Sequence, residues 1–134
     1  MAEQLPLPPA LEERLDRLGL EFVVELLRRS AARHPDNLET LSELATLLTR
    51  LGRHAEGLEA DLRLVRMAPA DATVRYNLAC SLALTGQKDQ ALDALERAVE
   101  LGYGDAKHLL DDADLSSLRG EARFHALIER LSVR

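Results

Sequence analysis

The sequence matches itself at an offset of 34 positions. Leu44-Ala45 recurs as Leu78-Ala79, and Gly52 recurs as Gly86. Further pairs at this offset are Pro35 and Pro69, Leu48 and Leu82, Leu58 and Leu92, and Asp71 and Asp105. A fixed period of this length indicates stacked supersecondary units, none of which can bury its apolar face alone. The period therefore predicts an array of such units.

Each period contains two stretches with helical spacing. Apolar residues from Leu38 to Leu48 recur at intervals of three and four, as on one face of a helix. The pattern breaks at Gly52, where a left-handed residue would end the helix. A second stripe runs from Ala55 to Val65, and the next period repeats the plan. Asp36 and Asp71 precede helices, where a short acceptor satisfies free backbone N–H groups. Each unit is thus predicted to be helix–turn–helix.

These patterns divide the chain into five segments. We expect an N-terminal extension at 1–8, full repeats at 36–71 and 72–105, and a partial repeat with a capping helix at 106–134. Segment 9–35 is predicted to be a helical pair, with helices near 9–18 and 20–34, forming either a degenerate repeat or a cap. The last segment is expected to hold a short helix to about 111 and a final helix near 121–132. A degenerate repeat is suggested because residues 15–19 resemble residues 48–52, although at an offset of 33 rather than 34.

Composition supports an all-helical domain. The chain has 134 residues, of which 46% are hydrophobic but only 3% aromatic. Leu and Ala supply most of the apolar share, and unbranched side chains lose little rotamer freedom in a helix. A chain of this length buries roughly two thirds of its unfolded surface. It therefore needs neither a metal nor disulfides to fold.

The charge balance, the single cysteine and the N-terminal sequence bear on the classes of partner and on the compartment that we expect. Lys and Arg number 17 against 23 Asp and Glu, a net charge of −6, whereas nucleic-acid binders carry basic patches. The single Cys80 cannot form an intramolecular disulfide, which fits a reducing compartment. The N-terminus lacks the pattern of a signal peptide, and no apolar run approaches the roughly 18 residues that span a bilayer. We therefore expect a cytoplasmic protein that neither binds nucleic acid nor inserts into a membrane.

The repeat residues resemble the tetratricopeptide repeat (TPR) family. Its signature positions fall on Leu44-Ala45 and Leu48, and again on Leu78-Ala79 and Leu82. The stretch from Tyr76 to Cys80 is similar to bacterial members. The positions that depart from the family pattern are Gly57, Asp61, Arg75 and Tyr103, which replace an alanine, an aromatic residue, a tryptophan or leucine, and a proline. The resemblance is strong over 36–105 and weaker over 106–131.

The resemblance implies an all-α, right-handed α-solenoid whose first helices line a concave face that grips a peptide or helix. It implies partner binding by Glu39, Ser42, Glu43, Thr46, Arg50, Thr73, Tyr76, Asn77, Cys80, Leu84 and Lys107. Tyr76 is either a binding anchor, a role in which Tyr is enriched, or a half-buried packing residue. Asn77 could hydrogen-bond an extended peptide, or it could be an exposed or capping residue.

Catalytic and metal chemistry find little support. No two of the four histidines have the i, i+4 spacing that places two ligands on one helix face. Cys80 is interpreted as a small buried thiol, because reactive thiols need electropositive, partly exposed surroundings. The acidic run at 111–114 is interpreted as a solvated turn in which Asp114 caps a helix. We therefore expect no enzyme activity, no cofactor and no metal.

Three non-enzymatic functions remain open. The first is an adaptor that binds a partner peptide or helix in the groove. The second is a TPR-type chaperone for a secreted substrate. The third is a self-assembling, homo-oligomeric module, because a short array with irregular ends exposes apolar surface.

Overall fold

A computed structural model describes residues 6–133, so residues 1–5 of the predicted N-terminal extension, and residue 134, lie outside the described part. All its regular elements in that range are helical, as the sequence predicted. The helices are α1 (Pro9–Arg33), α2 (Leu38–Arg50), α3 (His54–Met67), α4 (Ala72–Leu84), α5 (Lys88–Glu100), α6 (Ala106–Asp111), the 3₁₀ helix η1 (Ala113–Leu118) and α7 (Ala122–Ser132).

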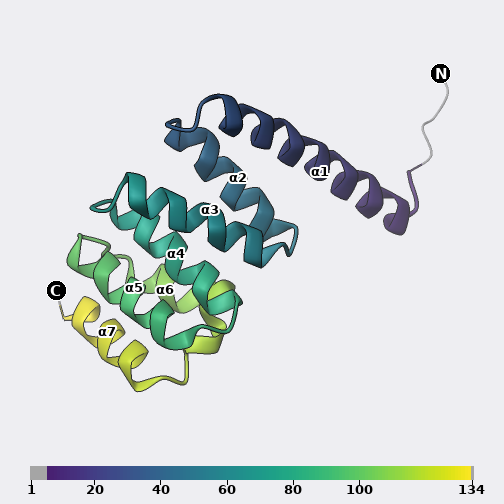
Figure 1. The fold of residues 1–134 in the computed structure, drawn as a ribbon. Coiled ribbons are helices and arrows are strands. Elements are labelled where there is room, and N and C mark those ends of the chain that lie inside the picture. Colours follow the sequence, from purple (N-terminus) through teal and green to yellow (C-terminus); the bar gives the residue numbers. More distant parts are fainter. Residues whose placement is uncertain (1–5, 134) are drawn as a thin grey trace.

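The helices stack as successive antiparallel pairs (Figure 1). α2 pairs with α3, α4 pairs with α5, and α3 packs on α4 to join the two hairpins. Their buried side chains form two clusters, one from Val24 to Val74 and a larger one spanning α4 to α7. Leu41 and Leu48 are fully buried in the first cluster, and Leu95 in the second. Each hairpin thus buries its apolar stripe against its neighbours.

One glycine follows the first helix of each hairpin, Gly52 after α2 and Gly86 after α4. Gly52 has φ +77° and Gly86 has φ +79°, the left-handed conformation that side chains with a Cβ disfavour. The N–H of the following residue, Arg53, donates to the carbonyl of Leu48, and that of Gln87 donates to the carbonyl of Leu82, at 2.9 Å each. These bonds satisfy helix-end carbonyls. The turn predicted at Gly52 is confirmed.

The helix N-termini confirm one predicted cap and correct another. The side chain of Asp71 accepts a hydrogen bond from the N–H of Val74 at 3.1 Å, as expected. In the first hairpin the cap is Asn37, whose side chain accepts from the N–H of Thr40 at 3.1 Å. The prediction of Asp36 was wrong by one position, because α2 begins at Leu38 and the cap must directly precede the helix.

The N-terminal segment differs from its prediction. A single 25-residue helix, α1, replaces the expected pair at 9–18 and 20–34, and it continues through Gly19. One glycine inside a helix costs only about 1 kcal/mol. Good helix formers, Leu18 and Leu20, flank it, and apart from its chain neighbours and the backbone of α1 itself no atom lies within 4 Å of the position that a Cβ would take there. The N-terminal half of α1 therefore extends away from the other helices (Figure 1).

The C-terminal end is covered. α7 begins and ends close to the predicted helix at 121–132, and it buries Phe124, Leu127 and Leu131. It contacts α5 and α6, which closes the larger cluster. Within residues 6–133, no helix combines the length and apolarity needed to cross a membrane.

Candidate partner-binding site

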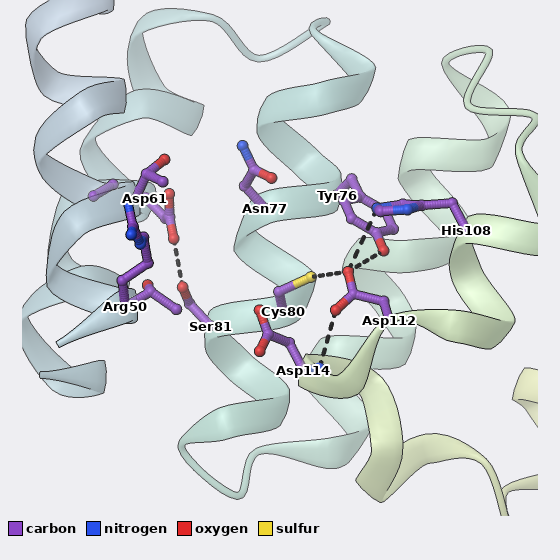
Figure 2. Close-up of a pocket in the computed structure, with 12 residues that line it drawn as sticks. Arg50, Asp61, Tyr76, Asn77, Cys80, Ser81, His108, Asp112 and Asp114 are labelled. Atoms are coloured by element: carbon purple, nitrogen blue, oxygen red, sulfur yellow. Dashed lines mark hydrogen bonds and ion pairs between the residues drawn. The ribbon is translucent and has the colours of Figure 1, made fainter. Parts of the chain in front are cut away.

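A cavity of about 210 Å³ lies among α2, α3, α4, α6 and η1 (Figure 2). Its lining residues are Ala45, Thr46, Thr49, Arg50, Asp61, Tyr76, Asn77, Cys80, Ser81, His108, Asp112 and Asp114. The first helices of both hairpins thus contribute to one site. Figure 2 shows Asp61 and Asp112 on opposite sides of the α4 residues Asn77 and Cys80.

Asp112 organises one side of the cavity. The Tyr76 hydroxyl donates to its Oδ2 at 2.5 Å, and the Cys80 thiol donates to the same oxygen at 3.7 Å. The backbone N–H of Asp114 donates to Oδ1 at 3.0 Å, and His108 Nε2 lies 3.6 Å from Oδ2. Both oxygens of this carboxylate are therefore engaged by the protein.

Tyr76 is held rigidly beside it. Its ring stacks on that of Tyr103, with centroids 4.4 Å apart and planes within 10°, and only 4% of the residue is exposed. Burial, and then the hydrogen bond to Asp112, raises the pKa of the Tyr76 hydroxyl above its ordinary value. These contacts are those of a packing residue, and only its cavity-lining part can meet a partner.

Asp61, on α3, lies on the other side of the cavity. It is 3% exposed, and the Ser81 hydroxyl donates to its Oδ2 at 2.5 Å. Within residues 6–133, no hydrogen bond reaches its Oδ1. Burial raises the pKa of Asp61 to about 6. Asp61 therefore loses much of its charge in mildly acidic solution but is ionised at neutral pH.

Cys80 is suited to packing rather than to nucleophilic chemistry. The residue is buried, as the sequence predicted. Burial, followed by the nearby charges of Asp112 and Asp114, raises the pKa of its thiol. Because the thiolate is the reactive form, a thiol held protonated is a poor nucleophile.

The structure brings together some predicted binding residues and leaves others apart. Five line the cavity, namely Thr46, Arg50, Tyr76, Asn77 and Cys80. Ser42, Glu43 and again Thr46 line a neighbouring apolar groove with Val23, Leu27 and Leu47. Glu39, Thr73, Leu84 and Lys107 line neither. Partner binding by all eleven stays a prediction.

Sequence analysis missed the acidic side chains of the cavity. Asp112, rather than Asp114, caps the following helix η1, and its side chain is only 16% exposed. The predicted turn is solvated only in part: Asp111 is exposed, but Asp112 and Asp114 are half-buried, and Asp112 accepts hydrogen bonds from Tyr76 and Cys80. One signal did mark Asp61, since it stands where the TPR pattern has an aromatic residue. No sequence spacing relates it to residues 112–114.

Comparison with known proteins places the fold but not the family. No family model matches the chain. It is 28% identical over 123 residues to a chloroplastic protein of Arabidopsis thaliana, a match that covers 90% of this chain but 35% of that protein. The chain therefore spans about a third of the length of this relative.

Among solved structures, MamA MSR-1 C2 matches with a TM-score of 0.66 at 21% identity, covering 87% of this chain and 69% of that one. MamA is a TPR-like helical solenoid. The predicted all-α, TPR-like solenoid is thus confirmed as the fold of this chain.

Proposed function

We propose that the chain is a non-catalytic protein-interaction module that binds a partner segment on the face formed by α2, α4 and α6. The observation that carries the proposal is the single cavity to which all three helices contribute. Stacked repeats build extended binding surfaces from corresponding helices, and binding sites are concavities with a few convergent polar groups. The adaptor and secretion-chaperone alternatives both place the partner here.

The neighbouring groove extends this face with an apolar surface. Val23 is 39% exposed, and with Leu27 and Leu47 it lines a groove between α1 and α2. Thr46 belongs to both the groove and the cavity. A bound segment that crosses Thr46 would place an apolar side chain in the groove and a polar one in the cavity.

Thr46 is therefore the position at which to test the proposal. It is exposed, and its hydroxyl donates only to the Ser42 carbonyl of its own helix. The variant Thr46→Arg should fill the surface without unfolding α2. The tagged chain, crosslinked in its native cells, should recover a partner that Thr46→Arg loses. The control Glu59→Arg, exposed on α3, should retain that partner.

Two results would count against this function. One is recovery of the same partner by wild type and Thr46→Arg alike. The other is recovery of no partner by the wild-type chain under crosslinking. Circular dichroism of both variants would show whether the fold is intact.

Self-assembly is a second candidate, and α1 favours it. Leu11, Leu15, Leu18, Phe22 and Leu26 follow helical spacing, and each is between 42% and 65% exposed. Large exposed apolar stripes mark interaction sites. The stripe is nearly symmetric about residues 18 and 19. Two antiparallel copies would therefore set Leu11 against Leu26 and Leu15 against Phe22, as a two-fold interface requires.

Sedimentation equilibrium tests this interface. The wild type should dimerise in the micromolar range, and Phe22→Glu should be monomeric because a carboxylate would be buried in the seam. Leu62→Glu, at another exposed leucine on α3, is the matched control and should still dimerise. A wild-type chain that stays monomeric at about 100 μM, which allows only a weak interaction, would exclude this candidate.

A further inference from the structure

Several carboxylates outside the cavity form ion pairs with arginines. Arg123 pairs with Asp93 at 2.5 Å and with Glu96 at 3.0 Å, and Arg53 pairs with Glu56 at 2.5 Å. The three carboxylates of the cavity lack such partners. Within residues 6–133, neither lysine nor arginine forms an ion pair with the side chain of Asp61, Asp112 or Asp114. His108 Nε2 lies 3.6 Å from the Asp112 carboxylate, and Arg119 donates to the backbone carbonyl of Asp112 rather than to its side chain. The cavity thus collects three carboxylates that form no ion pair with a lysine or arginine of the described residues, although Arg50 is among the lining residues.

Two of these carboxylates also have free acceptor capacity. Asp61 is 97% buried, and in the described chain its Oδ2 accepts a hydrogen bond from Ser81 while its Oδ1 accepts none and is not fully enclosed, as fits a residue that lines the cavity. The Asp114 side chain accepts none there, and burial together with the charge of Asp112 raises its pKa. An ionised carboxylate that is buried without a cation beside it is unfavourable, and a cation supplied by a ligand would reduce that cost. The site is therefore complementary to a positive charge.

We propose that the cavity binds the guanidinium group of an arginine from the partner segment, between Asp61 on one side and Asp114 on the other. This inference rests on the proposed function and names the side chain that the partner contributes. An arginine side chain offers five N–H donors in a planar fork, which can serve acceptors on two sides of a cavity at once. A lysine offers a single point charge.

A metal ion fits the same residues less well. Cys80, Asp112 and Asp114 place one donor atom each within 4.8 Å of one another. However, the Cys80 thiol donates its proton to Asp112, and a thiol must lose that proton to bind a metal. Asp112 Oδ2 already accepts from Tyr76 as well. The free acceptors of the cavity are thus arranged for an N–H donor.

Arg50 is the competitor within the chain. It lines the cavity, and Figure 2 shows it on the same side as Asp61. It is nevertheless exposed, and it forms no ion pair or side-chain hydrogen bond within the described residues. If the cavity selects a guanidinium, removing this neighbouring charge strengthens binding of an arginine from outside.

The test uses three N-acetylated, C-amidated pentapeptides of sequence Gly-Ala-X-Ala-Gly, with arginine, lysine or citrulline at X. Each is titrated into the ¹⁵N-labelled full chain at pH 7 while the amide signals of Asn77, Cys80 and Asp114 are followed. The arginine peptide should shift these signals with a Kd on the order of 1 mM, which corresponds to about 4 kcal/mol of binding free energy. Citrulline has the same shape without the charge and should bind at least about tenfold more weakly.

Variants of the cavity carboxylates test which side chains bind the arginine. Asp61→Asn and Asp114→Asn should each weaken binding of the arginine peptide about tenfold, the value of one charged hydrogen bond. Glu59→Gln, exposed on the same helix as Asp61, should leave it unchanged. Arg50→Gln should strengthen it. If Asp61→Asn is poorly folded, Asp114→Asn decides, since that side chain is only partly buried.

Three outcomes would overturn the inference. The first is equal affinity for the arginine and citrulline peptides, and the second is tighter binding of the lysine peptide than of the arginine peptide. The third is that Zn²⁺, equimolar to the protein, shifts the followed amide signals while none of the peptides does. These results are separable from the proposed function. Loss of the crosslinked partner in Thr46→Arg, with no response to the arginine peptide, would remove only this inference.

Discussion

The two ends of the solenoid differ in how well their apolar faces are covered, and the two phenylalanines of the chain show this difference. Phe124, in α7, is 1% exposed and belongs to the larger buried cluster. Phe22, in α1, is 65% exposed, although it also belongs to an amphipathic helix of the same array. A repeat unit buries its apolar face only where a neighbour covers it. The C-terminal end therefore has its cap, and the N-terminal end presents an open apolar face.

The apolar open end and the acidic cavity are neighbouring surfaces of different chemistry. The open face of α1 continues into the apolar groove at Val23 and Leu27, next to Thr46 of α2. The cavity lies one helix further along, on the junction of the two hairpins, where Asp61 of α3 meets Ser81 of α4. An apolar surface and a charged one thus adjoin on a single molecule.

The largest expected effect is on the free energy of unfolding, which alanine should change much more at Phe124 than at Phe22. Phe124→Ala should lower the free energy of unfolding by about 3–5 kcal/mol, because it leaves a cavity in a packed core. Phe22→Ala should change it by less than about 0.5 kcal/mol, as for other surface positions. Urea unfolding at low micromolar concentration, where self-association contributes least, measures both. A large loss for Phe22→Ala would mean that α1 packs against the body of the protein in solution.

The next effect concerns Asp61 at the junction of the hairpins. Because its pKa is raised to about 6 in the fold, the folded protein binds this proton more tightly than the unfolded chain. Its contribution is fully present below the unfolded pKa and is lost as the pH rises through about 6. The loss is on the order of 3 kcal/mol. It is measured as the pH dependence of unfolding free energy in wild type minus that in Asp61→Asn.

Subtracting the unfolding free energy of Asp61→Asn from that of the wild type isolates the contribution of Asp61. Other acidic groups, whose contributions have the opposite pH dependence, cancel in this difference. Glu56, near the open end, has its pKa lowered chiefly by its hydrogen bond to Arg53, so its contribution is present at high pH and lost in acid. A difference curve that is flat from pH 4 to 7 would contradict the buried, weakly solvated environment of Asp61. The charged and titratable side chains that share its cavity are Arg50, Tyr76, Cys80, His108, Asp112 and Asp114.

Sequence alone predicted the helices from α2 to α5 and the final helix, because local signals and the period agreed there. Gly52 and the cap Asp71 each act within one turn of chain, so their effect is readable from neighbouring residues. The cavity could not be predicted in the same way. Its hydrogen bonds join Asp61 to Ser81 and Tyr76 to Asp112, positions 20 and 36 residues apart, and depend on how whole helices pack.

The failure at α1 has a different cause. Residues 15–19 and 48–52 share the pattern Leu-x-Arg-Leu-Gly, yet Gly19 lies inside a helix while Gly52 ends one. At Gly52 the chain turns back and α3 packs on α2. At Gly19 no other element lies within 4 Å of the position that a Cβ would take, so no packing on that side would stabilise a turn. A local motif therefore permits a turn, and the packing that follows decides whether it forms.

The smallest expected effect tests this interpretation at Gly19 itself. Alanine there removes the flexibility of glycine inside a helix, worth about 0.5–1 kcal/mol, and meets no atom within 4 Å. Residues 9–19 of α1 belong to neither buried cluster, so we expect this part of the helix to open locally, and the gain should appear as up to about fivefold slower hydrogen exchange of amides 11–18. Gly52→Ala, at φ +77°, should instead destabilise its hairpin. If Gly19→Ala accelerated exchange as well, Gly19 would also be a turn in solution, α1 would fold back into a hairpin, and the apolar stripe at the open end would be covered by the chain itself.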